Sequence, residues 1–383
     1  MYKGRHIYDI AIIGAGASGL MLASSLKDKK VCIIEANSKI AQKIKISGGA
    51  KCNITNSLVT CDNYLGNKEF IKKILRNFSN DDLIKFLNSN GVYPKINPKL
   101  VKGTYFCKSS QDVIDMFTKL TTHVKKILNT KVDDVDFKDE VFIIKTSNTI
   151  IKAKKLVVAS GGLSYASLGA SSIAYDIAKK FGHDISKLDP ALVGFTVQKE
   201  QFWFKKLSGL SIMAKVKVED KSFNASLLFA HKGCSGPLIL NSSLYWKKGK
   251  ISFDFLPKQN YKELLKSNAL ISSKLPLPKR FVQEFLESIK VKDKSCSTLT
   301  KQDLDALSLI HNYEFSPAGN FGYTKAEVTK GGIKTEQIDV NSMESLKQKN
   351  LYFLGECLDV TGELGGYNFQ FAFSSAITCA RNI

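Results

Sequence analysis

The sequence predicts an α/β protein with an inserted β domain, and three stretches carry this prediction. In residues 7–35, IYDIAIIGAGASGLMLASSLKDKKVCIIE, an apolar strand enters a glycine-rich turn, a short helix follows, and a second apolar strand ends on Glu35. Residues 351–366 repeat the order of apolar strand, glycine-rich turn and helix start. From residue 192 onward, short strand-like runs dominate. Strands that alternate with helices favour a parallel sheet, and the strand-rich middle favours a separate β domain.

The glycines of the turn GAGASG fall where a dinucleotide-binding turn needs them. Gly14 permits the tight turn out of the strand, Gly16 lets a pyrophosphate approach the backbone, and Gly19 lets the helix pack close to the sheet. The helix N-terminus then faces the phosphates. Glu35 closes the second strand, where a carboxylate accepts hydrogen bonds from both hydroxyls of a ribose. This stretch therefore predicts a dinucleotide site, and a glycine-rich turn without a ligand is the alternative.

The composition is that of a globular protein with room for two or three domains. The chain has 383 residues, of which 44% are hydrophobic, and no apolar run reaches membrane-spanning length. The N-terminus lacks the long apolar region of a signal peptide. The eight cysteines include no CxxC pair, which indicates reduced thiols rather than disulfides or a metal site. We expect a cytoplasmic protein without stable membrane association, and its oligomeric state stays open.

The net charge of +21 makes an acidic partner plausible, nucleic acid before membrane, because no basic amphipathic helix stands out. The alternative is a lysine-rich composition without functional meaning. The only arginines are Arg5, Arg76, Arg280 and Arg381. A nucleic-acid-binding protein usually has more of them, because the guanidinium fork recognises phosphates and guanine.

Two further stretches combine glycines with polar side chains. Residues 42–56, QKIKISGGAKCNITN, follow the acidic residue of the ribose site, and we expect a loop that runs along the cofactor toward its reactive end. An ordinary polar loop is the alternative. Residues 154–162, KKLVVASGG, form an apolar strand that ends in another glycine-rich turn.

Glycine-rich turns, where a ligand can approach the backbone, occur from residue 14 to residue 366. This spread favours a large cofactor that is held along its whole length, rather than a briefly bound NAD. That cofactor is FAD. Its AMP half would lie on residues 14–35, and its ribityl chain would meet Gly355 and Glu356. The helix that opens at Gly366 would face the N1–O2 edge of the isoalloxazine ring.

Six motifs resemble, in order, those of the YhiN/BaiN-like flavoproteins, also described as aminoacetone-oxidase-family or NAD(P)/FAD-dependent oxidoreductases. They are GAGASG, KISGGAKCNITN, ASGGLSY, LFAHKGCSGP, EVTKGGI and LYFLGECLDVTGELGGYNFQFAFSSA. The resemblance covers essentially the whole chain. It implies tightly bound FAD in a two-dinucleotide-binding fold of the glutathione-reductase type, interrupted by a β-barrel-like domain that carries a helical subdomain.

The resemblance also implies domain boundaries and cofactor contacts. The FAD-binding domain would occupy 1–190 and 333–383, the inserted β domain 191–258 and 313–332, and the helical insert 259–312. With Gly19 and Glu356 from the turns above, the expected FAD-binding residues are Gly14, Gly16, Ala17, Ser18, Glu35, Ala36, Lys43, Ser47, Asn53, Thr55, Val132, Gly161, Gly355, Asp359, Gly366 and Asn368. Val132 would act through its backbone, next to the adenine.

The sequence departs from the family pattern at two places. Lys51 stands where the family usually has Arg, so a bidentate contact to a phosphate or to the cofactor is weaker there. Residues 169–175, GASSIAY, replace a more glycine-rich stretch near the expected flavin entrance. A second GxGxxG for a nicotinamide cofactor is absent, so the sequence does not identify the reductant, for which NADPH and NADH are the candidates.

The family has been tied to dihydrouridine formation in large-subunit ribosomal RNA, to steroid or bile-acid reduction, and to amine oxidation. The charge of +21 favours the first, with ribosomal RNA or a ribosome-assembly intermediate as the partner. In that reaction, flavin N5 delivers a hydride to uridine C6 and a general acid protonates C5. The alternatives are an oxidase or ene-reductase of a small molecule, and an RNA-binding protein in which FAD is structural.

Two residues are candidates for the general acid. Cys52 lies in the loop expected beside the flavin, and His231 lies on a glycine-flanked turn of the inserted domain. A packing role for each is the alternative. Three basic segments are candidates for RNA contacts, with a solvated basic face and core aromatics as the alternative. They are KLPLPKRF (274–281), Trp203-Phe204-Lys205-Lys206 and Tyr245-Trp246-Lys247-Lys248.

Overall fold

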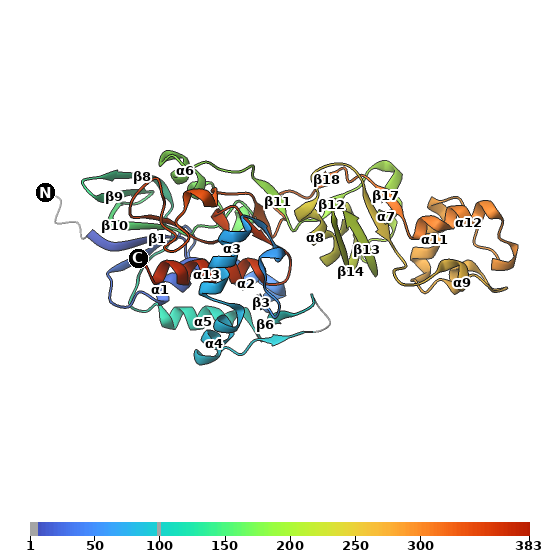
Figure 1. Cartoon of the computed structure of the whole chain (residues 1–383), viewed down its shortest axis with the longest axis horizontal. Helices are drawn as coiled ribbons and strands as arrows, with labels where there is room; N and C mark the ends of the chain where they lie inside the picture. The colour runs from blue at the N-terminus through green and yellow to red at the C-terminus, as the bar shows by residue number, and fades with distance from the viewer. Residues whose placement is uncertain (1–6, 98–100) are drawn as a thin grey trace. The chain divides into compact units, whose positions relative to one another are not determined.

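The computed structural model describes residues 7–97 and 101–383, which form two compact units (Figure 1). Unit 1 combines the chain up to Pro190 with Glu327–Ile383, and unit 2 is Ala191–Ala326. The expected return to the first domain at residue 333 is therefore too late. Residues 327–332 already belong to unit 1, because Thr329 forms hydrogen bonds with Leu163 and Glu356 of that unit.

The centre of unit 1 is a sheet of seven strands, most of them parallel. Its spatial order is β7 (Lys125–Ile127), β2 (Val31–Ile34), β1 (Ile7–Ile13), β10 (Ile150–Val158), β9 (Val141–Thr146) and β8 (Val132–Lys138), and β20 (Leu351–Phe353) also pairs with β10. β7, β2, β1, β10 and β20 are parallel, whereas β9 and β8 form an antiparallel meander with β10. β2 is completely buried, as a continuous apolar run requires in a sheet covered on both faces.

The register brings the ends of four parallel strands to one edge of this sheet. Ile13 at the end of β1 lies beside Ile34 of β2 and Val158 of β10, and Val158 lies beside Phe353 of β20. The glycine-rich turns after β1, β10 and β20 therefore meet at this carboxyl edge, together with Glu35 after β2. Open α/β sheets bind their ligands at this edge.

Two largely buried helices, α1 (Ala17–Ser24) and α13 (Tyr367–Ala380), pack side by side at the sheet (Figure 1). Their N-cap residues are Gly16 and Gly366, which lie at the carboxyl edge of the sheet. Ser79 caps the helix that follows it by accepting a hydrogen bond from the Asp82 N–H (3.2 Å). The remaining helices of unit 1 are α2 (Gln42–Ala50), α3 (Lys68–Asn77), α4 (Asn80–Ser89), α5 (Ser110–Leu120) and α6 (Ile173–Lys180).

Three small sheets complete unit 1. They are β3 (Asn53–Asn56) with β6 (Thr104–Phe106) and β5 (Lys95–Ile96), β4 (Tyr64–Gly66) with β21 (Val360–Gly362), and β11 (Asp189–Ala191) with β19 (Val328–Lys330). β19 lies in the stretch expected to return from the inserted domain. Within the residues that the structure describes, no helix is both long and apolar enough to cross a membrane.

Unit 2 contains a seven-stranded antiparallel sheet and a group of short helices (Figure 1). The strands, in spatial order, are β17 (Tyr313–Phe315), β16 (Ile251–Asp254), β13 (Ser211–Val218), β14 (Lys221–Ala230), β15 (Gly233–Ser235), β12 (Phe195–Thr196) and β18 (Gly319–Asn320). The helices are α7 (Trp203–Lys206), α8 (Pro237–Tyr245), α9 (Tyr261–Leu264), α10 (Ile271–Lys274), α11 (Lys279–Ser288) and α12 (Lys301–Leu307). The helical insert expected over 259–312 is thus present.

An aromatic core joins this helical insert to the sheet. The Trp203 ring lies 5.9 Å from Phe281 of α11 and 6.3 Å from Phe229 of β14, measured between ring centroids. Trp203 and Phe204 are buried. The interpretation of these two rings as core aromatics is therefore confirmed, and they are not available to stack on RNA bases, because burial against Phe229, Phe281 and neighbouring rings fixes α7 on the sheet.

Candidate functional site

The turn after β1 has no room for side chains at its first and last glycines. Gly14 has a φ of +103°, and a Cβ on it would lie 2.6 Å from the Ala159 carbonyl oxygen. A Cβ on Gly19 would collide with the Gly14 carbonyl oxygen. Gly16, in contrast, has no neighbouring atom within 4 Å of its Cβ position. The outer two glycines thus allow backbone to pack on backbone, and Gly16 leaves the open approach that a phosphate needs.

Glu35 is held beside this turn by its own hydrogen bonds. Its Oε2 accepts a hydrogen bond from the Ala15 N–H (2.8 Å), and its Oε1 accepts from the N–H and the side-chain amide of Asn37 (2.9 and 2.8 Å). The Thr130 N–H donates to the Glu35 carbonyl (2.9 Å), which brings the start of β8 with Val132 close to Glu35. The carboxylate is half-buried, Ala36 is exposed, and lone pairs of the carboxylate stay available to ribose hydroxyls.

The stretch 42–56 is more ordered than the expected loop. Residues from Gln42 form α2, and the helix breaks at Ser47, where ψ turns to 145°. Gly48, Gly49 and Ala50 follow with φ of +56°, +63° and +66°, and β3 begins three residues later. The expectation of a loop throughout is therefore wrong. The polar side chains expected to face the cofactor lie on both sides of this left-handed turn.

Cys52 and Thr55 follow the turn, and both are buried. Thr55 Oγ1 donates a hydrogen bond to Gln370 Oε1 of α13 (2.6 Å), so it ties β3 to that helix. Asn53, at the start of β3, is half-buried. Cys52 is fully enclosed and has a neighbouring thiol, because a hydrogen bond with Cys52 is the largest cause that raises the pKa of Cys107.

The Ala-Ser-Gly-Gly turn after β10 packs against two residues from the C-terminal segment of unit 1. A Cβ on Gly162 would lie 2.6 Å from Thr329 Oγ1 and 3.0 Å from Glu356 Oε1. Thr329 Oγ1 accepts hydrogen bonds from the N–H groups of Leu163 and Ser164 (2.8 and 3.2 Å). These contacts fix the path of the turn while Gly161, with a φ of +77°, has no neighbour within 4 Å of its Cβ position.

Glu356 is the centre of a polar network at this turn. Its Oε2 lies 2.6 Å from Lys43 Nζ, and its Oε1 accepts a hydrogen bond from the Thr329 N–H (3.0 Å). Lys43 comes from α2, so this ion pair joins the left-handed turn region to the 3₁₀ turn Gly355–Cys357. Lys43 and Glu356 were both expected at the cofactor.

The C-terminal glycines place α13 against the same edge. Gly355 has a φ of +69°, and its Cβ position lies 2.8 Å from Ser18 Oγ of α1. Gly366, with a φ of +92°, precedes α13, and a Cβ on it would lie 2.5 Å from the Thr55 carbonyl oxygen. The side-chain amide of Asn368 pairs with the Gly362 backbone in both directions (2.8 and 2.9 Å). Asp359 accepts a hydrogen bond from Ser186 Oγ.

These residues fit FAD. The N-termini of α1 and α13 have no side-chain cap, so their first N–H groups are free to bind phosphate and carbonyl oxygens. Ser160 Oγ, in the turn after β10, is buried without a hydrogen-bond partner among the described residues, which is expected of a group that bonds to a ligand. Among those residues, no cluster of His, Cys, Asp or Glu is arranged to hold a metal ion.

Unit 1 contains every expected FAD-binding residue, and unit 2 contains His231. His231 is exposed at the turn between β14 and β15. Sequence reasoning did not name Thr329 or Glu327. Their only signal was the motif EVTKGGI, in which two polar residues alternate with an apolar one, and nothing in it indicates that its partner Gly162 lies so far away along the chain.

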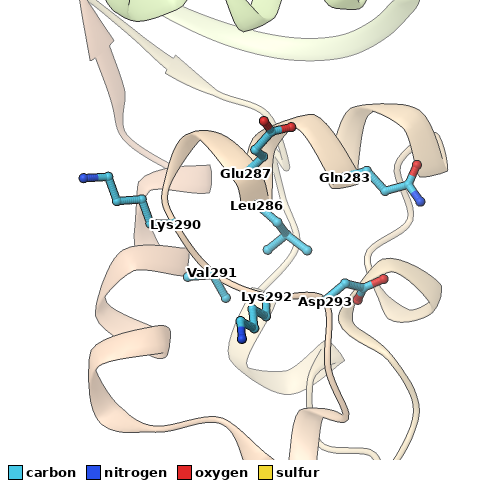
Figure 2. A pocket seen from close by; sticks show the side chains of 7 residues that line it. All are labelled: Gln283, Leu286, Glu287, Lys290, Val291, Lys292 and Asp293. Atoms are coloured by element: carbon cyan, nitrogen blue, oxygen red, sulfur yellow. The ribbon is translucent and has the colours of Figure 1, made fainter.

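A separate hollow of about 420 Å³ lies in the helical insert of unit 2 (Figure 2). It is lined by Gln283, Leu286, Glu287, Lys290, Val291, Lys292 and Asp293. Two lysines and two carboxylates leave it without net charge. It contains none of the expected site residues and does not have the character of an anion site.

Fold and site together define an FAD-dependent oxidoreductase on a Rossmann-type framework. The chain belongs to the family described as HI0933-like protein Rossmann domain, whose model matches residues 8–382. The expected family and the expected FAD fold are confirmed.

Relatives in this family carry two kinds of name. The chain is 37% identical to the ribosomal RNA dihydrouridine synthase of Haemophilus influenzae over 97% of each chain, and 36% identical to that of Escherichia coli over 98% of each. It is 27% identical to a 3-dehydro-bile acid delta(4,6)-reductase of Clostridium scindens, over 97% of this chain and 98% of the relative.

Solved structures show the same fold at low sequence identity. The FrdA chain of Escherichia coli quinol fumarate reductase aligns with 98% of this chain and 69% of its own length, at 13% identity and a TM-score of 0.50. A quinol-fumarate reductase solved with menaquinol aligns with 99% and 71%, at 14% identity and a TM-score of 0.52. At these identities the likeness concerns the fold alone.

Proposed function

We propose that this protein reduces the C5=C6 bond of a uridine in large-subunit ribosomal RNA to dihydrouridine. The observation that supports this most is the full-length relatedness to two ribosomal RNA dihydrouridine synthases, at 37% and 36% identity. Reduction of ribosomal RNA or of a ribosome-assembly intermediate would take place in the cytoplasm, with NADPH or NADH as the source of electrons.

The reaction adds a hydride at C6 and a proton at C5 of the uracil ring. FAD in its reduced form, when bound, supplies the hydride and is oxidised. The residues of the chain have the remaining tasks. The uncapped N-terminus of α1 binds the pyrophosphate, Glu35 binds the ribose, and the edge formed by Gly161 and Gly355 admits the rest of the cofactor. A proton donor must stand within hydrogen-bond reach of C5.

An RNA substrate agrees with the charge of unit 2. Residues 191–326 contain twenty-one Lys and Arg against eleven Asp and Glu, a higher net charge per residue than unit 1 has. Lys247, Lys248 and Lys250 lie exposed in the loop after α8. Exposed lysines of this kind can bind RNA phosphates, whereas Tyr245 of the same segment is buried and cannot stack on a base.

A second candidate is the reduction of a small enone. The relative named 3-dehydro-bile acid delta(4,6)-reductase favours it, because that protein has nearly the same length and is also related over the whole chain. The lower identity of 27% places this candidate second.

Mass spectrometry of ribosomal RNA from a strain without the gene tests the proposal. We expect one dihydrouridine in the large-subunit RNA to disappear and to return when the gene is supplied again. A complementing G14A variant, which is deficient in the cofactor turn, should not restore it. An unchanged dihydrouridine map, together with turnover of a bile-acid-like enone by the purified protein, would support the second candidate instead.

A further inference from the structure

One carboxylate next to the Glu356 network has no partner. Glu327 stands immediately before β19, two residues from Thr329, and is half-buried. Within residues 7–97 and 101–383, its carboxyl group forms no hydrogen bond or ion pair. A half-buried carboxyl group without a protein partner is free to form hydrogen bonds with solvent or with a bound substrate.

Glu327 and Glu356 are two carboxylates close to a single cation. Lys43 Nζ contacts Glu356 Oε2 at 2.6 Å, and Glu356 Oε1 accepts a hydrogen bond from the Thr329 N–H, so both carboxylate oxygens of Glu356 have a partner. Lys43 exerts only a charge effect on Glu327, without direct contact. The other titratable neighbour, Tyr165, contributes a phenol that is itself shifted by burial and by Glu327.

The surroundings of Glu327 favour the protonated form of its carboxyl group. Burial raises the pKa of Glu327 to about 6, and the positive charge of Lys43 offsets only part of this effect. Burial and the neighbouring Glu327 raise the pKa of the Tyr165 phenol, so it stays neutral. A carboxyl group whose pKa is raised toward neutrality by burial can hold a proton and give it up as a general acid.

We infer that Glu327 is the general acid of this site, and that Lys43 and Glu356 are the positioning pair beside it. The inference rests on the proposed uridine reduction. As the hydride pair reaches C6, the carboxylic acid of Glu327 gives its proton to C5, the new C–H bond forms and the O–H bond breaks. Glu327 is left as a carboxylate, which the charge of Lys43 stabilises until water returns the proton.

The geometry favours Glu327 over the two residues expected from the sequence. Cys52 is fully enclosed, so a substrate carbon cannot reach its thiol without rearrangement of β3. His231 is exposed on a turn of unit 2. Glu327, in contrast, is only half-buried. It lies two residues from Thr329, which packs on the Gly161–Gly162 turn expected at the cofactor.

The test compares E327Q with the wild type and with E336Q, which removes an exposed carboxyl group elsewhere in unit 1. Each protein is purified with its FAD, and dihydrouridine formation on ribosomal RNA is measured between pH 5 and 9. We expect the wild-type and E336Q rates to fall as pH rises through the pKa of the acid. E327Q should be at least 100-fold slower, without that pH dependence, because a lost general acid typically costs 10²- to 10⁴-fold.

Two readouts do not depend on turnover. E327Q should retain FAD and its reduction by dithionite, and loss of FAD from E327Q would overturn the inference, because a proton donor is not needed to hold the cofactor. Infrared titration should show a carboxyl group that protonates near pH 6 in the wild type and not in E327Q. A wild-type rate and pH profile in E327Q would also overturn it. If wild-type protein forms no dihydrouridine, the proposed function fails, and the infrared titration still decides whether Glu327 is held neutral.

Discussion

At the carboxyl edge of unit 1, several glycines occupy positions where a side chain would not fit. Gly14, Gly162 and Gly366 each meet backbone or side-chain atoms within 3 Å of their Cβ positions. The turns therefore pack directly on one another, and the open positions Gly16 and Gly161 are what remain for a ligand. A cofactor cradle built from backbone tolerates no added methyl group at its contact points.

The Gly14→Ala variant should lose FAD and stability together. Its Cβ would lie 2.6 Å from the Ala159 carbonyl oxygen, and the φ of +103° is unfavourable for alanine. The matched control is Gly91→Ala, which has a positive φ of +82° but no atom within 4 Å of the new Cβ. We expect G91A to cost about 1–2 kcal/mol of unfolding free energy with FAD retained. Absorbance of bound flavin and urea unfolding measure both, and full FAD occupancy in G14A would contradict the prediction.

The ionised carboxylate of Glu327 should decrease the free energy of unfolding at neutral pH. Its pKa is raised in the folded protein to about 6, above the usual value of 4.5, so below pH 4.5 the group is neutral in both states. As pH rises through 6, the folded protein must ionise a half-buried carboxyl group. The unfolded chain ionises the same group in water, at a lower cost in free energy. E327Q should therefore be more stable than the wild type at pH 8, by at most about 2 kcal/mol, with little gain at pH 4.

Urea unfolding at the two pH values measures this difference, and the exposed carboxyl of Glu336 provides the control. E336Q should match the wild type at both. A wild type that is as stable as E327Q at pH 8 would show that Glu327 ionises without cost.

At the scale of elements, the sequence was sufficient to predict those turns, helices and strands whose structure depends on residues close together in the chain. The turn GAGASG, the capped helix α4 and the strands of unit 2 follow from spacing and turn residues within one stretch of chain. The stretch 42–56 differed from expectation, because its first residues form a helix that packs on α5, and the two glycines lie in the left-handed turn that breaks this helix. The pairing of Gly162 with Thr329 and Glu356 was not predictable, since those contacts join segments separated by the whole of unit 2.

The loop after α8 should contribute to RNA binding as an element. Lys247 and Lys248 are exposed there, without an ion-pair partner in the part of the chain that the structure describes. We expect K247E/K248E to weaken binding of ribosomal RNA and to reduce the slope of log affinity against log salt by about 2, one per lost phosphate contact. K27E/K29E makes the same charge change on unit 1, on exposed lysines after α1. Equal losses in both variants would mean that only total charge matters.

At the scale of the whole molecule, the excess of positive charge should govern association with RNA. A protein of net charge +21 that binds a polyanion releases counterions, so its affinity depends steeply on salt. We expect the affinity for ribosomal RNA to fall at least about tenfold between 50 and 200 mM salt. Fluorescence anisotropy with a labelled RNA fragment measures it. A flat response would indicate that the lysine content reflects composition only.

The insertion of unit 2 into unit 1 sets the order in which the chain can mature during synthesis. β10 has its partners β1 and β9 early, but β20 and α13 come from the last residues, after all of unit 2. Until those residues leave the ribosome, the end of β10 at Leu156–Val158 lacks its β20 partner, and Ser18 lacks its neighbour Gly355. FAD capture is therefore expected to be post-translational, and a nascent chain stalled before β20 should bind no flavin and should be prone to association through the open strand edge.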